Sequence, residues 1–577
     1  MDRKSIVLIV ILALIVLFYW QILEFLGLHE PEPPRQAAPT EQIDSSTQDA
    51  AKQQDTFVSP SGAAIPDLLS DTSAISPQLS EDILPDTTKI DSVIITTNKY
   101  EITMISLGGG PVSMLLKEHT YRDGNLIEML PEPMNVALEA GFAGGAVMTG
   151  KLPFVSSLAP GAYAIKDKEL TLDYTFRAPS GVEIIKHYTF FPDTYSFDMV
   201  LAVRNTERLG IDLQYELVWN NPPPVTEPDA KTDFNAMNAV AMIGGSRKQL
   251  DDYSDGALNQ SESGTTTWAG VRSKYFTSVM IPKSQLAEGA HATGRKWKAT
   301  IDGKEVEVKQ IAAALEMPLG GRHEIRDSFT VFVGPMDYFL MRSYDVGLED
   351  MLDIGTTPFI GWIIKPFAIA VMWALPKMYH VISNYGVVII LFSLIIKIIT
   401  MPLSLKSFKS MQAMKDLQPK IEELKKQYQK NPQAMNQEMM KLYKKHGVNP
   451  LSGCLPILLQ MPLLFAMFSV FQATILLRDA PFVWFIKDLS HGATGFTDPY
   501  IALVILMVAA QFLSQHLTMA SSTQQNKALM YIMPLMMGFF LYSLPSGLIL
   551  YWICFSVFSL LDWLVYRRPK NVHVQTA

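Results

Sequence analysis

The chain has 577 residues, of which 48% are hydrophobic and 30 are methionine, and its formal net charge is −8. This length exceeds that of one ordinary domain, and this composition is too apolar for a purely soluble protein. Residues 27–355 carry 27 Lys and Arg against 46 Asp and Glu, whereas the rest carries 21 against 10. Opposite net charges favour two compartments over a single nucleic-acid-binding surface.

Residues 5–26 form the first apolar segment, close to the roughly 20 residues that a membrane span needs. Arg3 and Lys4 precede it and predict a cytoplasmic N-terminus. A cleaved signal peptide is the alternative, but no small-residue cleavage site follows. We therefore expect a transmembrane anchor over 1–27. A disordered linker rich in Pro, Ser, Thr, Gln and Asp should follow over 28–90.

Residues 91–345 contain short segments with alternating apolar side chains, such as ELTLDYTF and VEIIKHYTFF. This pattern predicts a large antiparallel β-sandwich. Its histidines are far apart and lack metal-ligand spacing, so we expect no metal, no cofactor and no catalytic group there. Residues 346–384 are apolar but interrupted by Lys365, Pro366 and Pro376, which favours an amphipathic helix lying at the membrane surface.

Five further candidate spans follow, at residues 385–404, 452–474, 499–517, 528–544 and 547–565. The loop 405–450 contains ten lysines against four acids and predicts a helical hairpin broken at Asn431–Pro432. The tail 569–577 follows a basic stretch. Six spans, with both termini and the lysine-rich loop in the cytoplasm, satisfy the positive-inside rule. The acidic region between the first and second spans is then exported, and 385–568 forms a five-helix core.

A lysine lies inside the second span. On a helix, Ser393, Lys397, Thr400 and Ser404 share one narrow stripe. Another face, formed by Phe392, Ile396, Ile399 and Leu403, is suited to lipid. A charge there costs roughly 2.5–3.5 kcal/mol on insertion and normally faces protein or water. The alternative is that the lysine extends its side chain to the cytoplasmic interface.

Other spans add polar side chains that favour a wet interior: Gln460, Gln472, Gln511, Ser514 and Gln515. No acid within a span is clearly placed to pair with Lys397, although Asp562 lies near the inner end of the last span. This arrangement suggests that the partner of the lysine is a negatively charged group of the substrate.

Three segments carry a resemblance to a known family. NPLSGCLPILLQMPLLFAMF (449–468), LPSGLILYW (544–552) and KDLQPKIEELKKQY in the lysine-rich loop resemble the YidC/Oxa/Alb family of membrane protein insertases. The whole chain resembles its Gram-negative branch. The resemblance implies a multi-pass α-helical membrane protein with six transmembrane helices and an all-β super-sandwich domain between the first two spans. It also implies the inner membrane of a Gram-negative bacterium, with a periplasmic β domain.

The resemblance further implies a hydrophilic groove, open to the cytoplasm and to lipid, that receives nascent membrane proteins. Where the family usually has arginine this chain has Lys397, and Trp552 stands where relatives commonly have tyrosine. The expected groove residues are Lys397, Ser393, Thr400, Gln460, Gln511 and Trp552. The expected hydrophobic exit path follows the third and fifth spans at Met461, Pro462, Leu464, Met533, Met537 and Phe540.

The resulting hypothesis is an insertase and chaperone without bond chemistry, working alone or with the Sec translocon and its accessory subunits. Further expected partners are phospholipids and, through the hairpin and tail, the ribosome and the signal recognition particle receptor. Two alternatives remain at this point. One is a secondary transporter of an anionic solute with Lys397 as counter-charge, and the other is a membrane-anchored carbohydrate enzyme.

Overall fold

The computed structural model describes residues 90–567, apart from gaps at 132–135, 143, 146, 210–213, 302, 320–321, 323, 356–360, 429–430, 448–454, 496 and 520–523. The predicted anchor, nearly all of the predicted linker and the predicted tail lie outside these residues.

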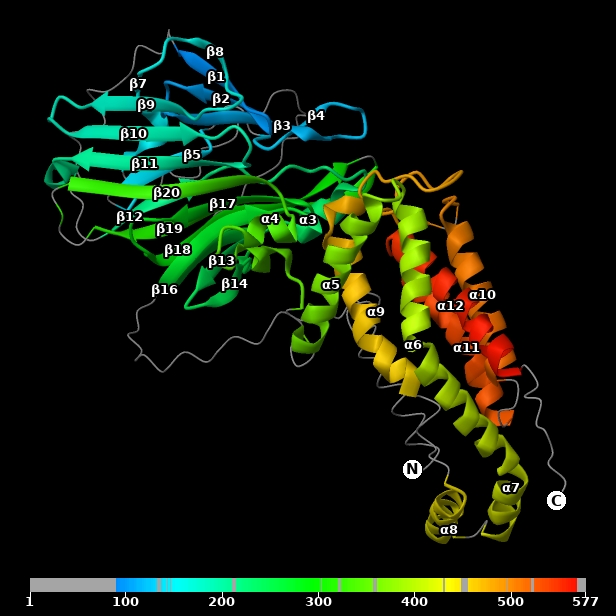
Figure 1. Cartoon of the computed structure of the whole chain (residues 1–577). Helices are drawn as coiled ribbons and strands as arrows, with labels where there is room; N and C mark the ends of the chain where they lie inside the picture. Colours follow the sequence, from blue (N-terminus) through cyan, green and yellow to red (C-terminus); the bar gives the residue numbers. More distant parts are fainter. Residues whose placement is uncertain are drawn as a thin grey trace, which may run out of the picture. The chain divides into compact units, whose positions relative to one another are not determined.

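The first half of the described chain, residues 90–335, forms two β-sheets and is called the β region below (Figure 1). The small sheet has the order β4 (Leu126–Glu128), β3 (Gly110–Thr120), β2 (Tyr100–Ile105), β1 (Ser92–Thr96) and β8 (Gly161–Ala164). The large sheet has the order β6 (Val147–Met148), β5 (Leu138–Phe142), β12 (Gln214–Trp219), β19 (Lys304–Pro318), β18 (Ala287–Ile301), β16 (Ala257–Arg272), β17 (Phe276–Pro282), β20 (Glu324–Pro335), β11 (Ser196–Arg204), β10 (Glu183–Phe190), β9 (Leu170–Arg177) and β7 (Val155–Ser156). Beside this path, β13 (Asn238–Ile243) pairs with β14 (Ser246–Leu250) and β16, and β15 (Tyr253–Ser254) pairs with β16.

The predicted alternation of side chains is present in these strands. In β10, the buried residues Ile184, Lys186, Tyr188 and Phe190 alternate with half-buried ones. Because successive side chains of a strand point to opposite faces, this places one face of β10 in the core. There the Tyr188 hydroxyl donates to the Gly109 carbonyl at 2.8 Å, which ties the large sheet to the chain just before β3. The prediction of a large β domain is confirmed.

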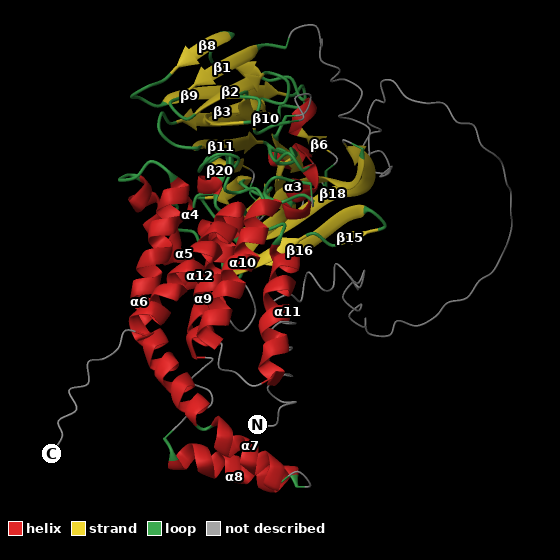
Figure 2. Cartoon of the chain, turned by 90° about the vertical axis from the view of Figure 1, so that its right-hand side faces the viewer, coloured by secondary structure: helices red, strands yellow, loops and turns green. Residues whose placement is uncertain are grey.

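The second half, residues 361–567, is helical and is called the helical region below (Figure 2). Its helices are α5 (Gly361–Tyr379), α6 (Tyr385–Asp416), α7 (Gln418–Gln427), α8 (Pro432–Lys445), α9 (Leu455–Ala473), α10 (Ile501–Met519), α11 (Gln524–Leu541) and α12 (Ser546–Arg567). The shorter helices among the described residues are α3 (Ala230–Ala236), α4 (Tyr338–Arg342) and the 3-10 turns η1 (Thr149–Lys151), η2 (Thr206–Leu209), η3 (Leu348–Leu352) and η5 (Ile475–Leu477).

The five predicted spans of the core each fall on one long helix, α6, α9, α10, α11 or α12. Among the described residues, one stretch, Tyr385–Ser407, is both long and apolar enough to cross a membrane. The other four helices contain shorter apolar stretches, at Gln460–Ala473, Ile501–Leu517, Ile532–Leu541 and Ser546–Leu560. The number of spans therefore stays a prediction.

The helix α6 is longer than the span predicted for it. Asn384 caps its start, because the side-chain oxygen accepts from the Val387 amide at 3.1 Å. The helix then runs without interruption through Asp416, so the expected boundary at residue 405 is not a helix end. The break comes at Leu417, before α7. Leu417 and Ile421 are buried and pack with Met439 and other residues of α8, which closes the hairpin.

The helix α5 packs along α9 and also contacts α6. Ile364, Val371 and Leu375 are among the residues on its buried face, whereas Trp362 and Trp373 are exposed. One face is thus fixed to the helical region and the other presents aromatic side chains. Its expected position at the membrane surface stays a prediction.

Candidate functional site

The polar stripe expected on α6 is buried inside the helical region. Ser393, Lys397 and Ser404 are buried, and Thr400 is half-buried. The three hydroxyls each donate to a carbonyl one turn earlier on α6, at 2.5–3.3 Å. Such local bonds use the hydroxyl hydrogens and leave the oxygen lone pairs as acceptors. The stripe therefore carries hydroxyl acceptors on the same face of α6 as Lys397.

The Lys397 side chain is held against α12. The residue is only 5% exposed, and its ammonium donates to the Ser559 hydroxyl at 2.9 Å. The ammonium also lies 4.7 Å from the centre of the Phe555 ring, a distance that gives cation–π attraction. In the described conformation the lysine is therefore directed at α12, and its position relative to the cytoplasmic interface stays a prediction.

Two more predicted groove residues, Gln511 on α10 and Trp552 on α12, are in contact with each other. The side-chain oxygen of Gln511, on α10, accepts from the Trp552 indole and from the Ser556 hydroxyl, both at 2.9 Å. Indole nitrogen can only donate, so Gln511 is held as an acceptor by two donors. Trp552 thus supplies the kind of donor that a tyrosine hydroxyl would provide, at the position where the resemblance implies tyrosine.

Gln460, on α9, lies beside another residue of α12. Tyr551 is fully buried, and its hydroxyl faces Gln460 without a hydrogen bond of good distance and angle. The structure therefore brings Lys397 and Gln511 to one stripe of α12, formed by Trp552, Ser556 and Ser559. Gln460 is directed at the neighbouring side of the same helix.

Sequence reasoning missed Ser559, Ser556 and Phe555 as contacts of the predicted residues. A signal was available, because Trp552, Ser556 and Ser559 are spaced by four and three residues and so share one helical face. The polar character of this face of α12 could therefore be recognised from the sequence. Its contact with α6 and α10 depends on the packing of helices that are far apart in the sequence.

The face of α6 assigned to lipid was partly wrong. Phe392 is 6% exposed, whereas Ile395, Ile398 and Ile399 are exposed. The exposed face of α6 therefore differs from the face that was expected to contact lipid, because neighbouring helices cover the side that carries Phe392. Ile399 is common to both sets.

The expected exit path lies on two helices with different neighbours. On α9, Met461, Pro462 and Leu464 are half-buried, and this helix packs against α5, α6 and α12. On α11, Met533, Met537 and Phe540 are half-buried, and this helix packs against α10. The two helices lie apart in both views (Figures 1 and 2). A shared path along them stays a prediction.

Comparisons with known proteins agree with the two halves of this architecture. The family model described as YidC periplasmic domain matches residues 92–370, and the one described as 60Kd inner membrane protein matches residues 377–573. The membrane protein insertase YidC of Chlorobium luteolum is 34% identical over 580 residues, covering 97% of this chain and 94% of the relative. That of Prosthecochloris aestuarii is 31% identical over 592 residues, covering 99% and 96%.

A crystal structure of an active YidC insertase with its first transmembrane domain resolved is 18% identical. It covers 83% of this chain and 95% of its own, with a TM-score of 0.34. The matches in sequence extend over both the β region and the helical region. The chain therefore belongs to the YidC family of membrane protein insertases, which are inner-membrane proteins with a periplasmic domain.

Proposed function

We propose that this chain inserts nascent membrane proteins by drawing a polar or acidic segment of the substrate to Lys397, between α6, α10 and α12. The observation that carries the proposal is the buried ammonium of Lys397 on the helix best suited to span a membrane. A cation in that position is costly and attracts anionic groups strongly, because the surroundings have a low dielectric constant.

The energy for insertion comes from the substrate. Burial of about 20 apolar residues in the bilayer is strongly favourable, whereas the polar segment that must cross opposes it. A groove lined by Ser393, Thr400, Gln460, Gln511 and Trp552 lowers that barrier by supplying hydrogen-bond partners inside the bilayer. Hence no bond chemistry is needed.

The hydrophobic part of the substrate leaves along α9 and α11. Met461 and Met533 are among the flexible, half-buried side chains there, and methionine adapts to many partner shapes. Because it shelters apolar segments during folding, the same surface serves as a chaperone. The named relatives are insertases, which supports insertion over transport of a small anion.

The proposed topology has six spans, both termini in the cytoplasm and the β region in the periplasm of a Gram-negative cell. The lysine-rich hairpin is then cytoplasmic. Its two helices pack through apolar side chains, and its lysines include Lys441, whose side chain is 71% exposed. This basic surface suits phospholipid headgroups and ribosomal RNA. The signal recognition particle receptor and the Sec translocon are the further proposed partners.

Photo-crosslinking tests the proposal. A photoreactive amino acid is placed at Ser393, Met461 or Phe540 while a short membrane protein is synthesised. We expect all three sites to capture the nascent chain. The matched control is Ile398, which is exposed on the opposite side of α6 and should capture lipid. Capture at Ile398 but at none of the three sites would contradict the groove.

A further inference from the structure

A loop of the helical region, residues 474–500 between α9 and α10, is bonded to the β region by charged side chains, of which Arg478, Glu227 and Asp488 are buried. Each of the three guanidinium nitrogens of Arg478 donates across the junction. The acceptors are the Glu227 carboxylate at 3.1 Å and the carbonyls of Thr120 at 2.9 Å and Thr226 at 3.3 Å. The side chains of Arg478 and Glu227 are 5% and 6% exposed. An arginine with all its nitrogens used and little solvent is a strong, directional tie.

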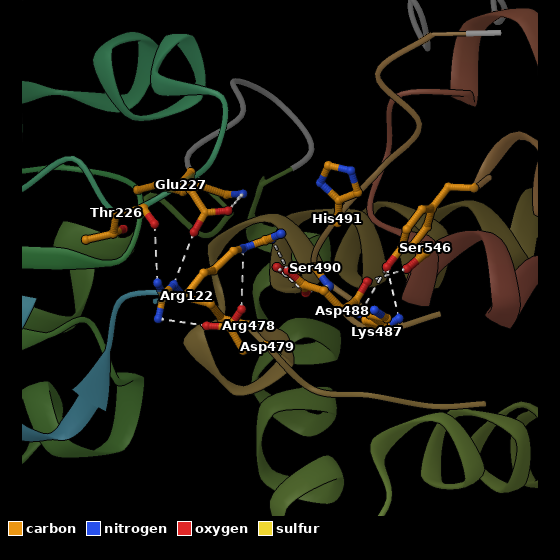
Figure 3. A network of polar contacts seen from close by, with 12 residues as sticks. Arg122, Thr226, Glu227, Arg478, Asp479, Lys487, Asp488, Ser490, His491 and Ser546 are labelled. Carbon is orange, nitrogen blue, oxygen red and sulfur yellow. Dashed lines mark hydrogen bonds and ion pairs between the residues drawn. The ribbon is translucent and has the colours of Figure 1, made fainter. Parts of the chain in front are cut away.

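A second arginine makes the reverse connection, from the β region into the loop. Arg122 donates to Asp488 at 2.5 Å and lies 3.5 Å from Asp479. The Asp488 side chain is 4% exposed and the Arg122 side chain is 41% exposed, so this pair is shielded from water on the side of the loop alone. We call Arg122, Glu227, Arg478, Asp479 and Asp488 the junction clamp; Figure 3 shows these side chains at the junction.

The same loop holds the first residues of α12. The Ser546 hydroxyl donates to the Asp488 carbonyl at 3.0 Å. The amides of Ser546 and Gly547 donate to the carbonyls of His491 at 2.7 Å and Leu489 at 2.9 Å. Amides at a helix start have no partner within the helix, so a fixed loop that accepts from them also fixes where the helix begins.

Between Ser546 and the polar stripe lie only about two helical turns, since Trp552 follows six residues later. A helix is stiff over that distance. A shift or rotation of its first turn therefore moves Trp552, Ser556 and Ser559 relative to α6 and α10. The bonds to Gln511 and Lys397 depend on that register.

We propose that the junction clamp positions α12, so that the β region sets the geometry of the polar stripe that faces Lys397. Arg478 and Asp488 are the central positioning residues: one fastens the loop to the β region and the other joins the loop to α12. This inference rests on the proposed function for its effect on insertion, but its effect on α12 does not.

Hydrogen–deuterium exchange of the full chain in lipid nanodiscs tests the proposal, together with an insertion assay. Arg478→Gln should raise amide exchange in residues 478–491 and in the first turns of α12 by at least about tenfold, since a buried pair is broken. Insertion should fall in parallel, and Arg478→Lys should restore little because the single ammonium nitrogen of lysine cannot reach the three separated acceptors that the guanidinium nitrogens reach. The matched control is Lys298→Gln, which breaks an exposed ion pair with Glu305 on β18 and β19 and should change neither readout.

Ser546→Ala supplies a second, milder variant that leaves the β region untouched. It should loosen α12 and slow insertion without raising exchange in β10 or β11. Unchanged exchange in α12 for both variants would overturn the proposal, as would a loosened α12 that inserts at the normal rate. Failure of the groove itself is recognised separately, because then a Lys397 variant would insert normally while the exchange results still test the clamp.

Discussion

Among the residues that the structure describes, two lysines are buried, one in each region, and their surroundings differ. In the β region, Lys186 donates to the carbonyls of Gly108 at 2.8 Å and Leu138 at 3.2 Å and has the Glu139 carboxylate nearby. In the helical region, Lys397 donates to the Ser559 hydroxyl and faces the Phe555 ring. Burial lowers the pKa of Lys186, and the charge of Glu139 opposes this shift.

The difference lies in how replaceable the partners are. Backbone carbonyls in a closed sandwich cannot turn away, and no substrate can reach them, so Lys186 serves the fold. The Ser559 hydroxyl can rotate away from the Lys397 ammonium. An acceptor on an incoming substrate could then take its place as the hydrogen-bond partner of the ammonium. The same residue type is therefore a structural cross-link in one region and, under the proposed function, a binding group in the other.

Replacing Lys186 by methionine gives the largest expected effect. The change leaves two buried carbonyls without their donor and removes the positive charge that offsets the buried Glu139 carboxylate, which should cost about 3–5 kcal/mol in the free energy of unfolding. Denaturant unfolding of the full chain, followed by tryptophan fluorescence, measures this. The double variant with Glu139→Gln should recover part of the loss. A normal unfolding curve would show that Lys186 is not a cross-link.

The same substitution at Lys397 should act on function and leave the fold intact. Methionine is apolar and of similar length, so Lys397→Met should keep or raise the unfolding midpoint, while insertion falls at least about tenfold as the attraction is lost. Lys397→Arg is the control and should retain insertion. If the methionine variant inserts as well as the native chain, the comparison between the two lysines fails.

Acid should destabilise the β region through a histidine that has no counterpart in the comparison of the two lysines. Burial against the rings of Tyr195 and Phe276 lowers the pKa of His119, in the β region, from 6.5 to about 4. The unfolded chain then binds a proton at a higher pH than the folded one. The stability that depends on neutral His119 is therefore complete above about pH 6.5 and is lost as the pH falls toward about 4. The expected loss in the free energy of unfolding is about 1–3 kcal/mol, where the lower figure allows for solvent screening.

His119→Gln should remove that part of the pH dependence, as seen in unfolding midpoints measured at neutral and at acidic pH. Insertion at neutral pH should not change. An unaltered slope would assign the acid sensitivity to other groups.

The smallest expected effect comes from the hydroxyl beside Lys397. Ser559→Ala keeps the charge and removes one acceptor, so insertion should change by only about threefold. Photo-crosslinking from Ser393 should still capture the substrate. A loss as large as that of Lys397→Met would mean that Ser559 itself is indispensable, and the hydroxyl would no longer be an exchangeable partner.

Much of the fold could be predicted because it depends on local periodicity. The alternation in VEIIKHYTFF gave β10, and the Asn431–Pro432 break gave the start of α8, where Asn431 caps the helix. The same alternation places Lys186 on the buried face with Ile184 and Tyr188, so its burial was readable though it was not recognised.

The contacts of the candidate site were less accessible. Helical spacing predicted that Ser393 and Lys397 lie on one face of α6, and the burial of both residues agrees with that prediction. The sequence did not show which helix covers this face of α6, because the packing of α12 on α6 joins residues more than 150 positions apart. The error at Phe392 has the same origin, since a helical wheel shows faces but not neighbours.

The length of α6 has a mechanical consequence. Its 32 residues give about 48 Å of helix, well beyond the roughly 30 Å of hydrocarbon, so it protrudes toward the hairpin as a lever arm. Pro402 interrupts the backbone bonding of this arm five residues after Lys397, because proline has no amide hydrogen to donate to the Ile398 carbonyl. A pull on α7 and α8 reaches Pro402 after the break at Leu417, and bending at either point would move the hairpin while the buried ammonium keeps its place.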